Sequence, residues 1–220
     1  GRKQEGISFL LIDMNSPGVT VTPITTIDGG DEINEVHFKD VRVPAGNLVG
    51  EAGRGWTYAK LLLTHERTGI ARVAESRARF NKLSDLISNP PDGAEALKHN
   101  AVFMARVIET EIELKALEFT ELRVLSDVST GRAPGPESSI LKIKGSEIQQ
   151  AIDELLMEVA GIYALPFVPE QYETGFEGEP VGPMFAAETA SHYYNNRKVS
   201  IYGGSNEIQK NIIARQVLGL

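Results

Sequence analysis

The sequence has no cysteine among its 220 residues. Disulfide bonds, thiolate metal sites and thiol catalysis are therefore excluded. Long hydrophobic runs are also missing. The longest apolar stretches, such as residues 9–12 and 61–63, fall far short of the roughly 20 residues that cross a membrane. We therefore expect a chain without a membrane partner, located in the cytoplasm.

Basic residues are in deficit, with 22 Lys and Arg against 30 Asp and Glu and a formal net charge of -8. No basic cluster occurs, so we expect no nucleic-acid partner. The 41% of hydrophobic residues are typical of a globular protein that buries a core. Residues 1–6 lack an initiator Met and a signal-peptide pattern, so the chain is expected to continue something longer.

The hydrophobic pattern changes its period near residue 50. Before it, residues 7–12, 19–27 and 36–43 are predicted to be extended strands, separated by turn sequences rich in Gly, Pro, Asn and Asp. Three strands alone would leave unpaired edges, so more sheet is expected from elsewhere.

After the glycine-rich residues 50–55, apolar residues recur at helical spacing. The predicted helices are 56–87, 94–128, one carrying residues 148–159, and two shorter ones at 184–200 and 206–217. The predicted fold is mainly α, an antiparallel long-helix bundle preceded by a partial antiparallel β domain. The predicted domains are 1–52 and 53–220.

Glu66 is a candidate for chemistry because it lies inside the apolar stripe of the first predicted helix, between Leu62 and Ile70. Burial raises the pKa of a carboxyl group toward neutrality, where a general base works well. A structural ion pair, with Arg67 or with a residue of another helix, explains the same position. The position alone leaves both interpretations open.

The second candidate is the turn from Tyr202 through Gly203 and Gly204 to Ser205, which precedes the last predicted helix. Its free backbone N–H groups, with Ser205 as N-cap, can face a ligand at the positive end of a helix dipole. The alternative is a well-capped helix start without a ligand. The four histidines are scattered without ligand spacing, so no metal site is expected.

Two motifs resemble the acyl-CoA dehydrogenase family. Residues 35–44, 47–50 and 53–56 are similar to the end of that family's middle β domain, and residues 201–215, IYGGSNEIQKNIIAR, resemble its C-terminal signature. Both motifs occur in the family's order. The resemblance implies that a helical domain and the first part of the β domain precede Gly1.

The resemblance implies an FAD-dependent enzyme that dehydrogenates an acyl-CoA thioester at the α,β position to trans-2-enoyl-CoA. In the family a carboxylate removes the α-proton, FAD accepts a hydride from the β-carbon, and an electron-transferring flavoprotein takes the electrons. The alternatives are an acyl-CoA oxidase and a non-catalytic structural partner subunit of a dehydrogenase complex.

The sequence departs from the family at the base. Many members carry a catalytic Glu directly after the signature Tyr, where this chain has Gly203. Other members place the Glu on the first long helix, before an Arg, and Glu66 with Arg67 is similar to that pattern. The resemblance therefore favours Glu66 as the base.

The other site residues are carried over from the same resemblance. Ser205, Asn206 and Glu207 are expected near the flavin. Substrate binding is expected at Arg67, Tyr202, Gly203 and Gly204.

A second departure concerns subunit contacts. Typical homotetrameric members have an Arg-x-x-Phe-Gly segment and a Gly-Gly-x-Gly turn that contact FAD of the neighbouring subunit, but residues 77–82 and 160–165 match them poorly. The chain thus resembles the larger, base-bearing subunit of bacterial enzymes built as unlike pairs. A homo- or hetero-tetramer is expected, with an unlike dehydrogenase subunit as the favoured partner.

Overall fold

The computed structural model describes residues 1–66, 69, 71–91, 93–131, 135–136, 138–172 and 174–220, without the side chains of residues 64–66 and 172. The chain folds into two compact units. The first contains residues 1–26 and 30–66, and the second contains residues 27–29 and the described part of 67–220. The prediction of domains 1–52 and 53–220 stays a prediction.

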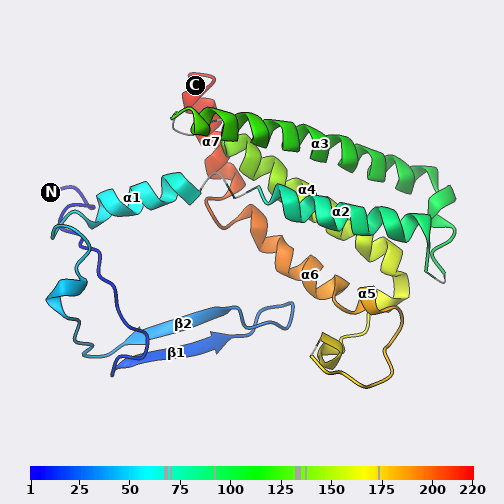
Figure 1. The fold of residues 1–220 in the computed structure, drawn as a ribbon, viewed down its shortest axis with the longest axis horizontal. Coiled ribbons are helices and arrows are strands. Elements are labelled where there is room, and N and C mark those ends of the chain that lie inside the picture. The colour runs from blue at the N-terminus through cyan, green and yellow to red at the C-terminus, as the bar shows by residue number, and fades with distance from the viewer. Residues whose placement is uncertain (67–68, 70, 92, 132–134, 137, 173) are drawn as a thin grey trace. The chain divides into compact units, whose positions relative to one another are not determined.

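The first unit holds an antiparallel pair of strands, β1 (Val19–Ile24) and β2 (Ile33–Phe38), which Figure 1 shows as two adjacent arrows. Their register pairs the first residue of β1 with the last of β2. The hairpin is closed where Thr26 N–H donates to the Gly30 carbonyl at 2.8 Å. A 3₁₀ turn (Ala45–Asn47) and helix α1 (Gly55–Glu66) follow.

The predicted strand at residues 7–12 is wrong, because among the described residues its backbone forms only one bridge, between Leu10 and Leu48. Its hydrogen bonds go instead to the irregular segment that leads into α1. Leu11 N–H donates to the Asn47 carbonyl at 3.0 Å, and Gly55 N–H donates to the Ile7 carbonyl at 2.7 Å. The 3₁₀ turn within the partner segment interrupts the regular spacing that a ladder needs.

The second unit is a bundle of long helices, and the mainly α fold with an antiparallel sheet is as predicted. Figure 1 shows α2, α3 and α4 running alongside one another. The helices are α2 (Val73–Ser88), α3 (Ala101–Ser129), α4 (Ser138–Ala160), α5 (Met184–Ala187), α6 (Thr189–Asn195) and α7 (Asn206–Gln216). The 3₁₀ turns are Leu97–His99, Gly161–Ala164, Pro169–Tyr172 and Asn196–Ser200. In the described part of the chain, no helix combines the length and apolar character needed to cross a membrane.

Helix α4 is the centre of this unit, since it packs against α2, α3, α6 and α7. Its buried residues are spread over most of its circumference, and they include polar as well as apolar side chains. The core around it contains Phe80 and Leu83 of α2, Leu114 of α3, and Ile148 and Ile152 of α4. Helices α6 and α7 and the 3₁₀ turn Asn196–Ser200 are therefore positioned on α4.

The single helix predicted over residues 56–87 is wrong. Arg72, just before α2, adopts a left-handed conformation (φ 49°, ψ 43°) that no continuous α-helix allows. The preceding Ala71 is fully buried, and it packs where α4 carries Gly145. A Cβ built on Gly145 would lie 2.6 Å from the Ala71 carbonyl oxygen. This close backbone approach is a tertiary contact, so helical spacing in the sequence does not signal it.

The helix predicted over residues 94–128 begins later than expected, at Ala101. The Asn100 side chain accepts hydrogen bonds from Val102 N–H at 3.0 Å and from Phe103 N–H at 3.1 Å. Asn100 is therefore an N-cap, which marks the true start of α3.

We predict that Gly145→Ala destabilises the protein by about 1–3 kcal/mol, although alanine is the better helix former. The added methyl group would collide with the Ala71 backbone, which is not free to move as a flexible side chain would be. Urea unfolding of the two proteins measures the difference. Gly46→Ala is the control, since a Cβ there meets open space. A Gly145→Ala protein as stable as the wild type would contradict the prediction.

Candidate functional site

The glycine turn of residues 202–205 connects the 3₁₀ turn Asn196–Ser200 to α7. Gly203 (φ 63°) and Gly204 (φ 85°) both occupy the left-handed region, which glycine adopts without steric cost. A Cβ on Gly204 would lie 2.6 Å from Gln209 Nε2. Ser205 is the N-cap predicted from the sequence, and its hydroxyl accepts from Ile208 N–H at 3.4 Å.

Two carboxamides of α7, on Asn206 and Gln209, are buried against α4. Ser139 of α4 donates its hydroxyl to Gln209 Oε1 at 2.8 Å. Gln209 Nε2 then donates to the carbonyl oxygens of Gly203 and Gly204, each at 3.4 Å. The turn is thus tied to α4 through a side chain of the helix that follows it.

The first residue of α7 is held in the same way. Lys142 Nζ donates to Asn206 Oδ1 at 2.8 Å, and Asn206 Nδ2 donates to Ser146 Oγ at 3.0 Å. Lys142 and Ser146 are each 3% exposed. Burial lowers the pKa of the Lys142 ammonium, and the negative charge of Glu207 opposes that shift. Among the described residues, the hydrogen-bond partner of this buried cation is a neutral amide.

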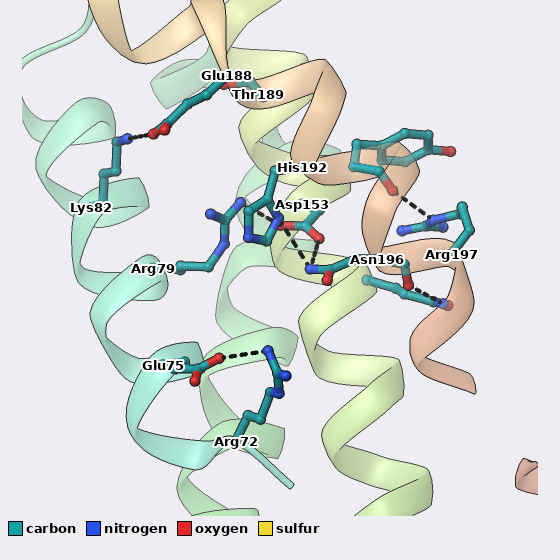
Figure 2. A network of polar contacts seen from close by, with 12 residues as sticks. Arg72, Glu75, Arg79, Lys82, Asp153, Glu188, Thr189, His192, Asn196 and Arg197 are labelled. Atoms are coloured by element: carbon teal, nitrogen blue, oxygen red, sulfur yellow. Dashed lines mark hydrogen bonds and ion pairs between the residues drawn. The ribbon is translucent and has the colours of Figure 1, made fainter. Parts of the chain in front are cut away.

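A second anchor on α4 holds the segment that enters the glycine turn, and Figure 2 shows it in detail. Asp153 is fully buried, and its Oδ1 lies 2.5 Å from Arg79 Nη2 of α2. Its Oδ2 accepts from Asn196 Nδ2 at 2.6 Å. His192 Nδ1 of α6 lies 3.2 Å from Asp153 Oδ1. One carboxylate therefore joins α2, α6 and the 3₁₀ turn that precedes Tyr202.

The predicted site residues fall in different parts of the chain. Glu66 is the last residue of α1 and belongs to the first unit, and its side chain lies outside the described residues, as does the whole of Arg67. Tyr202, Gly203, Gly204, Ser205, Asn206 and Glu207 are brought together by the glycine turn and the first residues of α7.

Within that group, the side chains point to different surroundings. The Tyr202 side chain is exposed, whereas Asn206 is buried and directs its carboxamide to Lys142 and Ser146. The Glu207 side chain is exposed, and hydrogen bonds from its own backbone amide and from the Ser205 hydroxyl lower its pKa. The flavin contact predicted for Asn206 stays a prediction.

Sequence reasoning did not single out Ser139, Lys142, Ser146 and Asp153. The sequence does contain a sign that Ser139, Lys142 and Ser146 are buried together. These polar residues recur at spacings of three and four on one face of α4, among apolar neighbours. The buried amides Asn206 and Gln209 show the same spacing of three on α7. A polar stripe on a helix that is otherwise apolar indicates paired polar groups in a core.

The segment matched to the family's Arg-x-x-Phe-Gly motif is engaged within the bundle. Arg77 Nε of α2 lies 2.6 Å from Glu118 Oε1 of α3, and this hydrogen bond raises the pKa of Arg77. Asn81 stands where the motif has glycine. The Arg77 guanidinium is thus committed to a neighbouring helix of its own chain.

Comparison with known proteins identifies the family. Residues 53–218 match the family described as "Acyl-CoA dehydrogenase, C-terminal domain". The chain belongs to the acyl-CoA dehydrogenase family. Acyl-CoA dehydrogenase IpdE1 from Mycolicibacterium smegmatis is 31% identical over 219 residues, which cover 100% of this chain and 50% of that protein. The chain therefore spans about half the length of the curated relatives it matches.

Solved structures show the same architecture. The crystal structure of the ChsE4-ChsE5 complex from Mycobacterium tuberculosis includes a chain that is 26% identical, with a TM-score of 0.79. That match covers 100% of this chain and 54% of the other chain. The Tcur3481-Tcur3483 steroid ACAD has a TM-score of 0.83 at 19% identity, over 100% of this chain and 53% of that one, and shows the fold.

We predict that Asp153→Asn lowers the free energy of unfolding by about 3–5 kcal/mol, since it leaves the charge of Arg79 without its buried partner. Urea unfolding measures the change. Glu113→Gln is the control, because it removes a carboxylate from an ion pair with Lys144 at the protein surface, where about 1 kcal/mol or less is expected. Equal losses in both variants would show that the Asp153 network carries no special weight.

Proposed function

We propose that this chain is part of an FAD-dependent acyl-CoA dehydrogenase and supplies Glu66 as the base that removes the α-proton of an acyl-CoA thioester. The observation that carries the proposal is the membership of the chain in the acyl-CoA dehydrogenase family, with the match spanning residues 53–218. The absence of a side chain at Gly203, where many family members have the catalytic Glu, supports the choice of Glu66.

The glycine turn fits a flavin and a thioester in its chemistry. Gly203 and Gly204 carry no side chains of their own and are exposed, at the N-terminal end of α7, where the helix dipole favours negative charge. The residues that would hold FAD are Ser205, Asn206 and Glu207. Tyr202, Gly203 and Gly204 would line the thioester, and Arg67 would orient the catalytic helix or approach the CoA moiety.

The proposed reaction divides into a proton transfer and a hydride transfer. The Glu66 carboxylate accepts the α-proton, and the electron pair of that C–H bond forms the new double bond of trans-2-enoyl-CoA. FAD, when bound, accepts the hydride that leaves the β-carbon. An α-proton beside a thioester is weakly acidic, so the base must be held close to it in a dry site with hydrogen bonds to the developing enolate.

The same features favour an unlike pair of subunits as the working enzyme. The guanidinium of Arg77, which corresponds to the family's neighbour-facing contact, is bound to Glu118, and Asn81 replaces the motif glycine. A partner subunit would supply the FAD contacts that this chain lacks. The ChsE4-ChsE5 complex contains a chain similar to this one, which supports such an assembly. Electrons would leave to an electron-transferring flavoprotein.

We predict that Glu66→Gln, in the full-length enzyme, lowers the rate of acyl-CoA oxidation by at least about 100-fold, because an amide cannot accept the α-proton. Bleaching of the flavin absorbance by acyl-CoA measures the rate, and the bound FAD should be unchanged. Glu75→Gln is the control, since Glu75 is an exposed residue of α2. An active Glu66→Gln enzyme would overturn the assignment of the base.

We also predict one FAD per pair of unlike subunits. The chain purified alone should lack stoichiometric FAD, and co-expression with a second dehydrogenase-like chain should restore the flavin and the activity. The measurement is the flavin absorbance per protein mass of the purified complex. One FAD per chain with full activity of the chain alone would contradict the unlike pair. If acyl-CoA does not bleach the flavin of the complex, the result would favour a non-catalytic structural role for this chain. If the reduced complex forms peroxide with oxygen, the result would favour an acyl-CoA oxidase.

A further inference from the structure

We propose that Lys142 is a positioning residue for the glycine turn: its buried ammonium fixes the Asn206 carboxamide and thereby sets the start of α7 and the conformation of residues 202–205. The proposal rests on the proposed function, because that function gives the turn its role at the flavin and the thioester. Lys142 itself lies on α4 and is assigned no contact with either.

Burial makes the position of Lys142 unfavourable for a cation, and the negative charge of Glu207 offsets only part of that cost, which argues that the residue does more than fill space. Its side chain is 3% exposed, and burial of an ammonium group is strongly disfavoured unless the group is paired. The ammonium group of Lys142 also lies at the N-terminal end of α7, where the helix dipole disfavours a positive charge. A neutral apolar side chain of similar length would avoid both penalties.

The geometry indicates what the ammonium does. A carboxamide can be flipped end for end at little cost, but here its oxygen faces a cation that can only donate. Lys142 Nζ binds Asn206 Oδ1 at 2.8 Å, which directs Asn206 Nδ2 to Ser146 Oγ at 3.0 Å. The hydroxyl of Ser146 lies 2.8 Å from the Ile143 carbonyl oxygen and 3.2 Å from Asn206 Oδ1, and it donates its one hydrogen at the shorter distance while its lone pair accepts from Asn206 Nδ2. The lysine thus selects one orientation of the amide.

The neighbouring amide is oriented in parallel. The Ser139 hydroxyl donates to Gln209 Oε1, which turns Gln209 Nε2 toward the carbonyls of Gly203 and Gly204. Asn206 and Gln209 lie three residues apart on α7, so both face α4. Loss of the Lys142 contact would free the first turn of α7, and the glycines, which have no side chains to restrain them, would gain alternative conformations.

The test compares Lys142→Met, Lys142→Arg and Lys144→Met in the full-length enzyme with its partner subunit and FAD. Lys144→Met is the matched control, because it removes the same charge from the same helix at an exposed position that binds Glu113 and Glu147. Three quantities are measured: amide hydrogen exchange along the chain, kcat and KM for acyl-CoA, and the flavin absorbance spectrum.

For Lys142→Met, we expect exchange at residues 202–208 to rise by about tenfold or more while residues 101–129 of α3 stay protected. The kcat should fall by about tenfold or more with KM within about threefold, because the turn is misplaced for the chemical step more than for binding. The flavin spectrum should shift. Lys142→Arg should recover kcat to within about threefold of the wild type, since a donating cation is kept. If Lys142→Met does not fold, Lys142→Gln takes its place, and the same changes are expected at smaller size, because the Gln amide can still donate to Asn206 Oδ1 but can also present an oxygen to it.

The proposal is overturned if residues 202–208 exchange at the same rate in Lys142→Met and in Lys144→Met. It is also overturned if exchange in Lys142→Met rises equally over α3 and the turn. In either case Lys142 contributes no more than general stability. The outcome is separable from the base assignment. If exchange at residues 202–208 rises in Lys142→Met but the Glu66→Gln enzyme is active, only the proposed function is overturned. If exchange in Lys142→Met is unchanged but the Glu66→Gln enzyme is inactive, only the role of Lys142 is overturned.

Discussion

Polar side chains buried along α4 must find hydrogen-bond partners, and this requirement positions the C-terminal elements of the helical unit. Asp153 is fully buried and obtains its partners from α2, α6 and the 3₁₀ turn after α6. Near the other end of α4, Lys142 and Ser146 are satisfied by the first residue of α7. Apolar packing against α4 would tolerate sliding, but a buried carboxylate or ammonium without its partner is strongly destabilising. The polar groups therefore act as fixed points in an otherwise apolar bundle.

The glycine turn lies between these two fixed points. Asn196 is bound to Asp153 before the turn, and Asn206 is bound to Lys142 directly after it. A sequence with two adjacent glycines is flexible by itself, and a flexible turn is a poor support for a reacting group, because catalysis depends on placement within a fraction of an ångström. Because the chain is held on both sides of the turn, the turn has a defined conformation although its two glycines carry no side chains. The chain belongs to the acyl-CoA dehydrogenase family, and in the proposed function this backbone lies beside the flavin and the thioester.

The sequence predicted the mainly α class, the long helices and the N-cap at Ser205, because these depend on local periodicity and on hydrogen bonds within a few residues. It was wrong where distant contacts intervene. Residues 7–12 have the composition of a strand, yet their partners in residues 47–55 are irregular, so no ladder forms. The helix predicted over residues 56–87 is interrupted ahead of α2, where Ala71 meets the backbone of α4 at Gly145. The site was predicted in the same partial way. The glycine turn is recognisable as a motif, whereas Lys142 and Asp153 lie 64 and 43 residues from their partners Asn206 and Asn196, and nothing local in the sequence identifies those partners.

The sequence by itself indicated the mainly helical class, most of the helical segments and the turn that could face a ligand, since helix periodicity, capping and glycine conformation are short-range properties. It also carried the motifs that link the chain to its family. Only the tertiary structure decided which residues satisfy the buried polar side chains of α4. Pairing is a property of surfaces that meet in the folded chain, and the sequence does not say that Lys144 pairs with Glu113 of α3 whereas Lys142 binds the first residue of α7.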